Sequence, residues 1–138
     1  MTNLRNDVNP AQRKRRSIRT HTILVVEDDR EVRDVVASLL LDEGYNVLEA
    51  GDGFEALEML GAAPVDLLFT DVRMPGMDGY ELARRAKQLH PQLPVIYTTG
   101  YSRRLPGGGE ALCGAILSKP WRRQELLAEF ARALTDRG

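Results

Sequence analysis

Cysteine, histidine and tryptophan are scarce in this sequence of 138 residues, which has one cysteine, two histidines and one tryptophan. Cys113 has no second cysteine with which to form an internal disulfide bond. A single thiol together with His21 and His90 is a poor ligand set for zinc. No apolar run approaches the roughly 20 residues that a membrane-spanning helix needs, and the polar N-terminus lacks the apolar segment of a secretory signal. We therefore expect a cytoplasmic protein without a membrane span.

The charges are divided unevenly along the chain, although the net charge is only −1. Residues 1–20 hold six Lys/Arg and one acid, whereas residues 21–138 hold thirteen Lys/Arg and nineteen Asp/Glu. The first segment has scarcely any apolar side chains that could offset the entropy of ordering it. We predict a flexible basic tail over residues 1–20 and one folded domain over residues 21–138, because a chain of this length has room for a single domain.

The basic tail contains one dense run of positive charge, Arg13-Lys14-Arg15-Arg16. Basic residues without aromatic neighbours or a folded reading element attract phosphates only weakly, and the attraction is sensitive to salt. No helix-turn-helix signal follows the run. Nucleic acid is therefore not an expected partner, and a solvated leader is the simplest interpretation of this tail.

Short apolar runs alternate with helical periodicity from His21 onward. Uninterrupted β-branched and aliphatic runs are typical of strands that are buried on both faces, as in a parallel sheet between two layers of helices. The predicted strands cover residues 23–26, 45–49, 66–70, 95–98 and 115–117. The pattern predicts an α/β fold with a five-stranded parallel sheet.

Apolar residues at three- and four-residue spacing mark the helices between these strands. In the first helix, one stripe is expected to face the sheet: Val32, Val35, Val36, Leu39 and Leu40. The apolar positions of the other helices are Phe54, Leu57 and Leu60 in the second, Leu82, Ala83, Ala86 and Leu89 in the third, and Leu126, Leu127, Phe130, Ala131 and Leu134 in the last. Before the fifth strand, residues 107–109 are all glycine and follow Pro106. The segment 102–114 therefore predicts at most a short or displaced helix.

Polar side chains directly follow four of the predicted strands. The first strand ends at Glu27 and Asp28, the third at Asp71, the fourth at Thr99 and the fifth at Lys119. The carboxyl ends of parallel strands meet at one edge of a sheet, where ligands bind. Crowded carboxylates repel one another unless their pKa values rise or a cation binds, and a ligand set of oxygens alone suits Mg²⁺. The sequence therefore predicts a Mg²⁺ site with an ammonium group opposite the metal.

A gap between a metal ion and an ammonium group suits a phosphoryl group. Asp71 is the candidate nucleophile, because a carboxylate can attack a phosphoryl donor when cations neutralise the developing charge, and the product is an aspartyl phosphate. The hydroxyl of Thr99 could donate to one of the phosphoryl oxygens. The acids Asp29, Asp52 and Asp78, in contrast, precede helices and are interpreted as helix caps or turn residues.

Four motifs at successive strand ends resemble those of the receiver domains of two-component response regulators. They are Val26-Glu27-Asp28, Asp71-Val72-Arg73-Met74-Pro75-Gly76-Met77-Asp78-Gly79, Thr99-Gly100 and Ser118-Lys119-Pro120. The resemblance covers about residues 21–137. It implies a flavodoxin-like, doubly wound (βα)5 fold with the strand order 2-1-3-4-5.

The resemblance also implies a role for each residue of the site. Asp71 corresponds to the phosphoacceptor, and Glu27 and Asp28 correspond to the acidic pair that holds Mg²⁺. The backbone carbonyl of Arg73 would complete the metal site, and Lys119 would contact the phosphate. The family implies that a histidine kinase or a histidine phosphotransfer protein supplies the phosphoryl group.

Thr99 corresponds to the switch hydroxyl, through which the phosphoryl group would bias a two-state equilibrium. Ile116 stands where receiver domains often have an aromatic residue, so the switch would work without a Tyr or Phe rotamer change. Residues 107–109 lie on the face that the family uses for partner binding or dimerisation, and homodimerisation stays open. Arg73 and Tyr101 occupy positions that tune the access of water to the acyl phosphate, and their size predicts a slower loss of phosphate.

The leading hypothesis is a stand-alone receiver that is phosphorylated on Asp71 and switches its binding to an effector protein. Such a protein is a binding module and not an enzyme with turnover on a separate substrate. A Mg²⁺-dependent phosphatase or phosphotransferase with an aspartyl-phosphate intermediate is an alternative, but haloacid-dehalogenase-type enzymes have a second acid where this chain has Arg73. A scaffold that is never phosphorylated is another alternative. The segments 98–102 and 118–121 also resemble receivers attached to hybrid histidine kinases.

Overall fold

The computed structural model describes residues 20–100 and 114–136. Within these residues, five strands form one parallel sheet in the order β2-β1-β3-β4-β5. The strands are β1 (Thr22–Val26), β2 (Asn46–Ala50), β3 (Leu67–Asp71), β4 (Val95–Thr99) and β5 (Gly114–Ser118). The helices are α2 (Arg30–Asp42), α3 (Gly53–Ala62), α4 (Gly79–Leu89) and α5 (Arg123–Asp136). The predicted flavodoxin-like fold and its strand order are confirmed.

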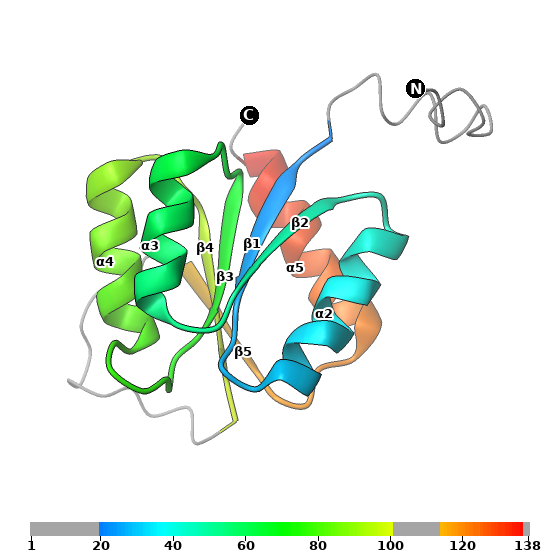
Figure 1. Cartoon of the computed structure of the whole chain (residues 1–138). Helices are drawn as coiled ribbons and strands as arrows, with labels where there is room; N and C mark the ends of the chain where they lie inside the picture. Colours follow the sequence, from blue (N-terminus) through cyan, green and yellow to red (C-terminus); the bar gives the residue numbers. More distant parts are fainter. Residues whose placement is uncertain (1–19, 101–113, 137–138) are drawn as a thin grey trace, which may run out of the picture.

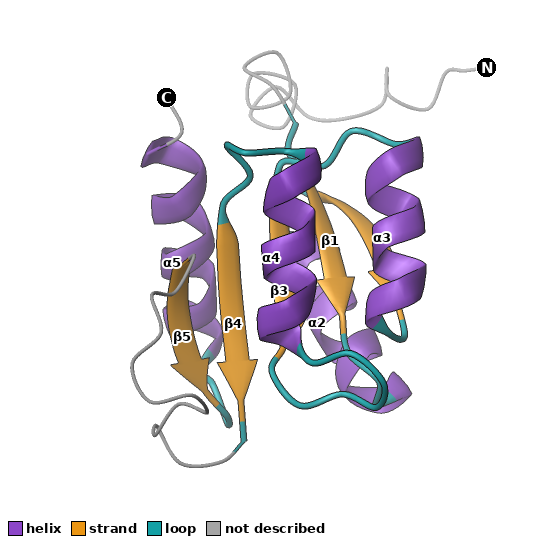
Figure 2. Cartoon of the chain, turned by 90° about the vertical axis from the view of Figure 1, so that its left-hand side faces the viewer, coloured by secondary structure: helices purple, strands orange, loops and turns teal. Residues whose placement is uncertain are grey.

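The sheet lies between two layers of helices (Figure 1). Helices α3 and α4 cover one face, and α2 and α5 cover the other (Figures 1 and 2). Each face has its own apolar cluster, one around Leu24 and Leu68 and the other around Val25 and Phe69. Successive side chains of a strand point to opposite faces, so neighbours in the sequence belong to different clusters.

The strands in the middle of the sheet are buried over their whole length. All five residues of β3 and all five of β4 are buried, whereas β2 and β5 at the two sides of the sheet are partly exposed. Strands that are covered on both faces consist mainly of apolar residues. Asp71 and Thr99, the last residues of β3 and β4, are therefore polar side chains held at the end of core strands.

An aspartate caps the start of each of the helices α2, α3 and α4. The carboxylates of Asp29, Asp52 and Asp78 accept hydrogen bonds from backbone amides of the first helical turn at 3.0, 2.8 and 2.8 Å. Such caps bind amide groups that have no partner within the helix. The interpretation of these three acids as helix caps is confirmed.

Four residues of the predicted apolar stripes are exposed, among them Val35, which we expected to face the sheet, and Ala131 of α5. Val35, Phe54 and Leu89 have exposed fractions of 61%, 56% and 50%. Successive residues of a helix differ by about 100° in direction. The buried side of α2 includes Val36 and Leu40, and this turns Val35 away from the sheet. The apolar stripe in the sequence is thus wider than the buried face of each helix.

Several predictions concern residues outside the described ranges. One is the basic tail over residues 1–20, of which only Thr20 is described. Another is the segment 102–114, of which only Gly114 at the start of β5 is described. The thiol of Cys113 and the side chain of Tyr101 also lie outside the described ranges. Among the helices that the structure describes, none combines the length and the apolar character needed to cross a membrane.

Gly79 permits a close contact between the start of α4 and the end of β3. Its backbone amide donates to the oxygen of Val72 at 2.8 Å, and a Cβ atom at this position would lie 2.3 Å from the backbone oxygen of Asp71. We expect Gly79→Ala to lower the free energy of unfolding by about 1–3 kcal/mol, because the strand would have to move to make room. Urea denaturation measures this change.

Gly61→Ala is the matched control for this substitution. Gly61 is exposed on α3, and a Cβ atom there would meet nothing within 4 Å. We expect this variant to be more stable than the wild type by about 0.5–1 kcal/mol, because alanine loses less backbone entropy in a helix. Equal stability of Gly79→Ala and the wild type would contradict the close contact.

Candidate functional site

Four strands end at the same edge of the sheet, which we call the carboxyl edge, and bring polar side chains there. Glu27 follows β1, and Lys119 follows β5. Asp71 and Thr99 are the last residues of β3 and β4. Figure 2 shows the arrowheads of β1, β4 and β5 pointing toward this edge. The fold thus brings together residues that are as far as 92 positions apart in the sequence.

Three carboxylates form the acidic part of the site. One oxygen from each of Glu27, Asp28 and Asp71 lies within 4.8 Å of the other two. Glu27 and Asp71 have exposed fractions of only 4% and 6%, whereas Asp28 is exposed. The acidic group is therefore open to solvent on the side of Asp28. Oxygen ligands at this spacing suit a hard divalent cation such as Mg²⁺.

Lys119 supplies a positive charge to this acidic group. Its Nζ atom lies 3.0 Å from Oε1 of Glu27 and 3.3 Å from Oδ2 of Asp71. Its backbone amide donates to the carbonyl oxygen of Thr99 at 2.8 Å, and this bond fixes the base of the side chain against β4. The ammonium group therefore bridges the two buried carboxylates and reduces their mutual repulsion.

Backbone amides bind the other oxygens of the two buried carboxylates. The amide of Asp29 donates to Oε2 of Glu27 at 3.1 Å. The amide of Arg73 donates to Oδ1 of Asp71 at 3.4 Å. Each carboxylate thus has one oxygen on a backbone amide and the other on Lys119. This arrangement orients both carboxylates before any ligand binds.

Arg33 supports the site from α2, a role that the sequence analysis missed. Its Nη1 atom donates to the backbone oxygen of Glu27 at 2.7 Å, and its Nε atom lies 3.4 Å from Oε1 of Glu49 on β2. Arg33 therefore joins the end of β1 to α2 and β2. The signal in the sequence is an arginine one turn into the helix that follows the acidic pair.

Burial and charge act in opposite directions on Glu27 and Lys119. Burial raises the pKa of the Glu27 carboxyl and the charge of Asp71 raises it further, while the Asp29 amide and Lys119 reduce the rise. Burial by itself would lower the pKa of the Lys119 ammonium, but the hydrogen bond to Glu27 and the charge of Asp71 outweigh burial and raise it. Lys119 is therefore held in its charged form.

The remaining predicted site residues surround this centre. Thr99 is buried at the end of β4, and Arg73 is exposed on the loop after β3. Ile116 of β5 is half-buried and lies opposite Tyr97 of β4, whose ring centroid is 5.2 Å from that of Tyr80 on α4. The aromatic pair beside Ile116 therefore comes from β4 and α4, whereas the family often has an aromatic residue at the position of Ile116 itself.

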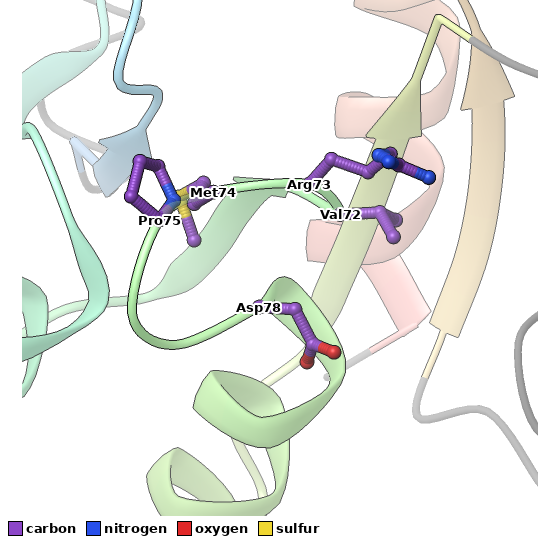
Figure 3. A pocket seen from close by; sticks show the side chains of 5 residues that line it. All are labelled: Val72, Arg73, Met74, Pro75 and Asp78. Atoms are coloured by element: carbon purple, nitrogen blue, oxygen red, sulfur yellow. The ribbon is translucent and has the colours of Figure 1, made fainter.

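A cavity of about 400 Å³ lies at the loop between β3 and α4. It is lined by Val72, Arg73, Met74, Pro75 and Asp78 (Figure 3). The carboxylate of Asp78 is engaged as the cap of α4. The loop therefore adds space directly after Asp71 in the chain but contributes no further carboxylate to the acidic group.

Comparison with known families agrees with this geometry. The family model described as the response regulator receiver domain matches residues 23–131. The chain belongs to this family. Receiver domains act in two-component systems, where phosphorylation and partner switching are general properties, and they bind Mg²⁺ at the acidic pocket.

This receiver domain is similar to curated proteins of different lengths. It is 37% identical over 114 residues to the response regulator receiver protein CpdR of Brucella abortus, covering 81% of this chain and 95% of that protein. It is 42% identical over 118 residues to the response regulator MprA of Mycobacterium ulcerans, covering 83% of this chain and 50% of that protein. The chain thus spans nearly the whole of one relative and half of the other.

Solved structures show the same fold. The receiver domain of the hybrid histidine kinase CckA matches with a TM-score of 0.70 and 38% identity, covering 82% of this chain and 98% of that one. The response regulator TrrA of Thermotoga maritima, solved in complex with Mg²⁺-BeF, matches with a TM-score of 0.77 and 28% identity, covering 83% of this chain and all of that one. At least one similar protein therefore binds Mg²⁺.

Lys119→Met tests how far the folded state depends on the bridging charge. The substitution keeps an unbranched side chain but leaves Glu27 and Asp71 without their shared cation. We expect the free energy of unfolding at neutral pH to fall by about 1–3 kcal/mol, less than for a fully buried pair because 24% of the Lys119 side chain is exposed. Urea denaturation at several pH values measures the loss.

The pH dependence of this loss has a defined sign. The loss should shrink as the pH falls toward the raised pKa of Glu27, because the neutral Glu27 carboxyl no longer needs the charge of Lys119. The raised pKa of Lys119 means that its contribution is complete up to the ordinary lysine value and disappears only at higher pH. Lys87→Met on α4, away from the acidic group, is the control. An equal loss in both variants would contradict the bridge.

Proposed function

We propose that this receiver domain accepts a phosphoryl group on Asp71 in the cytoplasm and thereby changes its affinity for a partner protein. The position of Asp71 supports this proposal. One oxygen of its buried carboxylate lies within 4.8 Å of an oxygen of Glu27 and of an oxygen of Asp28. Its Oδ2 atom lies 3.3 Å from Nζ of Lys119. A nucleophile between a metal-ligand set and an ammonium group is what phosphoryl transfer to an acid requires.

The donor set of the site fits Mg²⁺. Glu27, Asp28 and Asp71 offer only oxygen ligands, and their negative charges outnumber the single positive charge of Lys119. We propose that these three side chains and the backbone carbonyl of Arg73 hold the ion. When bound, Mg²⁺ would withdraw negative charge from the phosphoryl oxygens.

The proposed donor is a phosphohistidine of a histidine kinase or of a phosphotransfer protein. A carboxylate oxygen of Asp71 attacks the phosphorus atom and forms an O–P bond, while the N–P bond to the donor imidazole breaks and leaves its electron pair on nitrogen. The released imidazole nitrogen then takes up a proton from solvent. Lys119, held in its charged form, pairs with the phosphoryl oxygens in place of its present carboxylate contacts.

Thr99 and Lys119 are the proposed link between phosphorylation and partner binding. They share a backbone hydrogen bond of 2.8 Å, so a movement of one acts on the other. In the phosphorylated state, the Thr99 hydroxyl donates to a phosphoryl oxygen while the Lys119 ammonium binds another. These contacts favour one of two existing conformations and so shift the affinity for the partner.

Turnover on a separate phosphoester is not part of this proposal. The residue two positions after the nucleophile is Arg73, which cannot serve as an acid for a leaving group. The next acid along this loop, Asp78, is engaged as the cap of α4. The site therefore supports acceptance of one phosphoryl group rather than repeated hydrolysis.

Incubation with a small acyl-phosphate donor and Mg²⁺ tests the assignment of Asp71. Intact-mass spectrometry should show the gain of one phosphoryl group in the wild type and none in Asp71→Asn, because an amide is not a nucleophile at this site. Asp52→Asn is the matched control, since Asp52 caps α3 at the same carboxyl edge and asparagine is an equally good cap. It should be labelled like the wild type.

Three results, from this experiment and from assays with phosphoesters and with a histidine kinase, would contradict the proposal. Equal labelling of the wild type and Asp71→Asn would show another acceptor. Steady release of inorganic phosphate from unrelated phosphoesters would indicate an enzyme. A wild type that stays unmodified with the small donor and with a competent kinase would indicate a scaffold.

Single substitutions of the other two acids test the metal site. We expect Glu27→Gln and Asp28→Asn to raise the Mg²⁺ concentration for half-maximal phosphorylation at least about tenfold. The reason is that mutation of even an outer-shell partner of a metal site typically lowers the metal affinity by that factor. Glu31→Gln, an exposed acid in the first turn of α2, is the control and should leave this concentration unchanged. Phosphorylation that is independent of Mg²⁺ in the wild type would rule out the metal site.

A further inference from the structure

Trp121 is the single tryptophan of the chain and lies two residues after Lys119. Its indole Nε1 donates to Oγ1 of Thr98 at 2.7 Å. The ring is half-buried and packs against Phe69, with 6.0 Å between the ring centroids and 57° between the ring planes. This polar contact joins the connection between β5 and α5 to strand β4, within the cluster under α2 and α5.

Thr98 lies next to the phosphoacceptor in the sheet. In the register of β3 and β4, Thr98 is the cross-strand partner of Asp71, and its carbonyl accepts a hydrogen bond of 2.9 Å from the amide of Val72. Cross-strand partners in a parallel sheet point to the same face. The hydroxyl that binds Trp121 and the carboxylate that the proposed reaction uses therefore leave the sheet on the same side.

The segment that carries Lys119 is thus held to β4 at two points. The backbone amide of Lys119 donates to the carbonyl of Thr99, and the indole of Trp121 donates to the hydroxyl of Thr98. These acceptors are consecutive residues of β4. The direction in which Lys119 extends from the backbone therefore depends on both hydrogen bonds.

Packing alone does not account for an indole at this position. A phenyl ring could fill the same apolar cluster, but it has no N–H group to donate. Thr98 is 2% exposed, so its hydroxyl has little access to water as an alternative partner. The indole N–H therefore supplies the hydrogen bond of this hydroxyl, and loss of the indole leaves the buried Thr98 hydroxyl without this partner.

We propose that Trp121 is a positioning residue for phosphorylation: its hydrogen bond to Thr98 fixes the segment 119–121 so that the Lys119 ammonium stays at Asp71. This inference rests on the proposed phosphorylation of Asp71. Trp121, which lies outside the acidic group, thereby keeps the phosphate-contacting Lys119 in place.

Two substitutions remove the hydrogen bond from opposite ends. Trp121→Phe keeps an aromatic ring beside Phe69 but removes the donor, and Thr98→Val keeps the shape of the strand residue but removes the acceptor. We expect each to lower the rate of phosphorylation by a small acyl-phosphate donor at saturating Mg²⁺ by about three- to tenfold, the range that corresponds to one hydrogen bond. The double variant should be no slower than the slower single variant, because both changes remove the same contact.

Further measurements separate positioning from a general loosening of the fold. Thr98→Ser retains the hydroxyl and should restore the wild-type rate. The half-saturating Mg²⁺ concentration should not rise in Thr98→Val, because the substitution removes none of the three carboxylates of the acidic group. The one indole N–H resonance of the chain should exchange slowly with solvent in the wild type and faster in Thr98→Val.

Tyr45→Phe is the matched control for removal of a polar group from an aromatic side chain. Tyr45 packs against Phe130 in the same cluster, with 6.5 Å between the ring centroids, and lies away from Lys119. This variant should be phosphorylated at the wild-type rate. A loss of rate as large as in Trp121→Phe would show that the cluster, and not the hydrogen bond, matters.

The outcomes distinguish this inference from the proposed function. A wild type that is not phosphorylated on Asp71 overturns both. If the wild type is phosphorylated on Asp71 and both Trp121→Phe and Thr98→Val are phosphorylated at the wild-type rate, the positioning role alone is overturned. Independent effects of the two substitutions, or a parallel rise in the half-saturating Mg²⁺ concentration, also overturn it.

Discussion

Two carboxylates buried side by side are the constraint on which the rest of this receiver domain depends. Glu27 and Asp71 expose only 4% and 6% of their surface, and burial together with the charge of Asp71 raises the pKa of the Glu27 carboxyl. Lys119 bridges them at 3.0 and 3.3 Å, and a backbone amide binds the remaining oxygen of each. With Asp28 included, three carboxylates share one ammonium group, so the formal charge of the group is −2. The site's own lysine thus neutralises it only partly, and the remaining negative charge is compatible with the Mg²⁺ that receiver domains bind at the acidic pocket.

The parallel sheet creates this site because each strand ends where a loop leads into the next helix. Helices α2, α3 and α4 all begin at the carboxyl edge, where Asp29, Asp52 and Asp78 cap them. These acids lie near the site in the sequence but do not join the acidic group. The difference is local: Glu27 and Asp71 end buried strands, whereas the caps turn back to bind the amides of the helix that follows.

Short-range patterns predicted the strands, the caps and the acidic group, because an apolar run and the polar residue that ends it are adjacent in the sequence. The order of the strands followed only from the family resemblance. The prediction that Val35 faces the sheet was wrong, since helical spacing gives the width of an apolar stripe but not the part that the sheet covers. The contacts of Arg33 and Trp121 were missed because their hydrogen-bond acceptors lie six and 23 residues away, with no repeating pattern to connect them.

The end of β4 connects the site to both layers of helices through three consecutive residues. Tyr97 packs toward α4, Thr98 binds the segment before α5, and the carbonyl of Thr99 holds the amide of Lys119. Alternation along the strand places the first two side chains on opposite faces, so a displacement of Thr99 toward a phosphoryl oxygen would act on both layers. Interiors packed at crystal-like density transmit such a displacement instead of absorbing it. With Ile116 at the position where the family often has an aromatic ring, the aromatic contact to α4 comes from Tyr97 of the neighbouring strand β4.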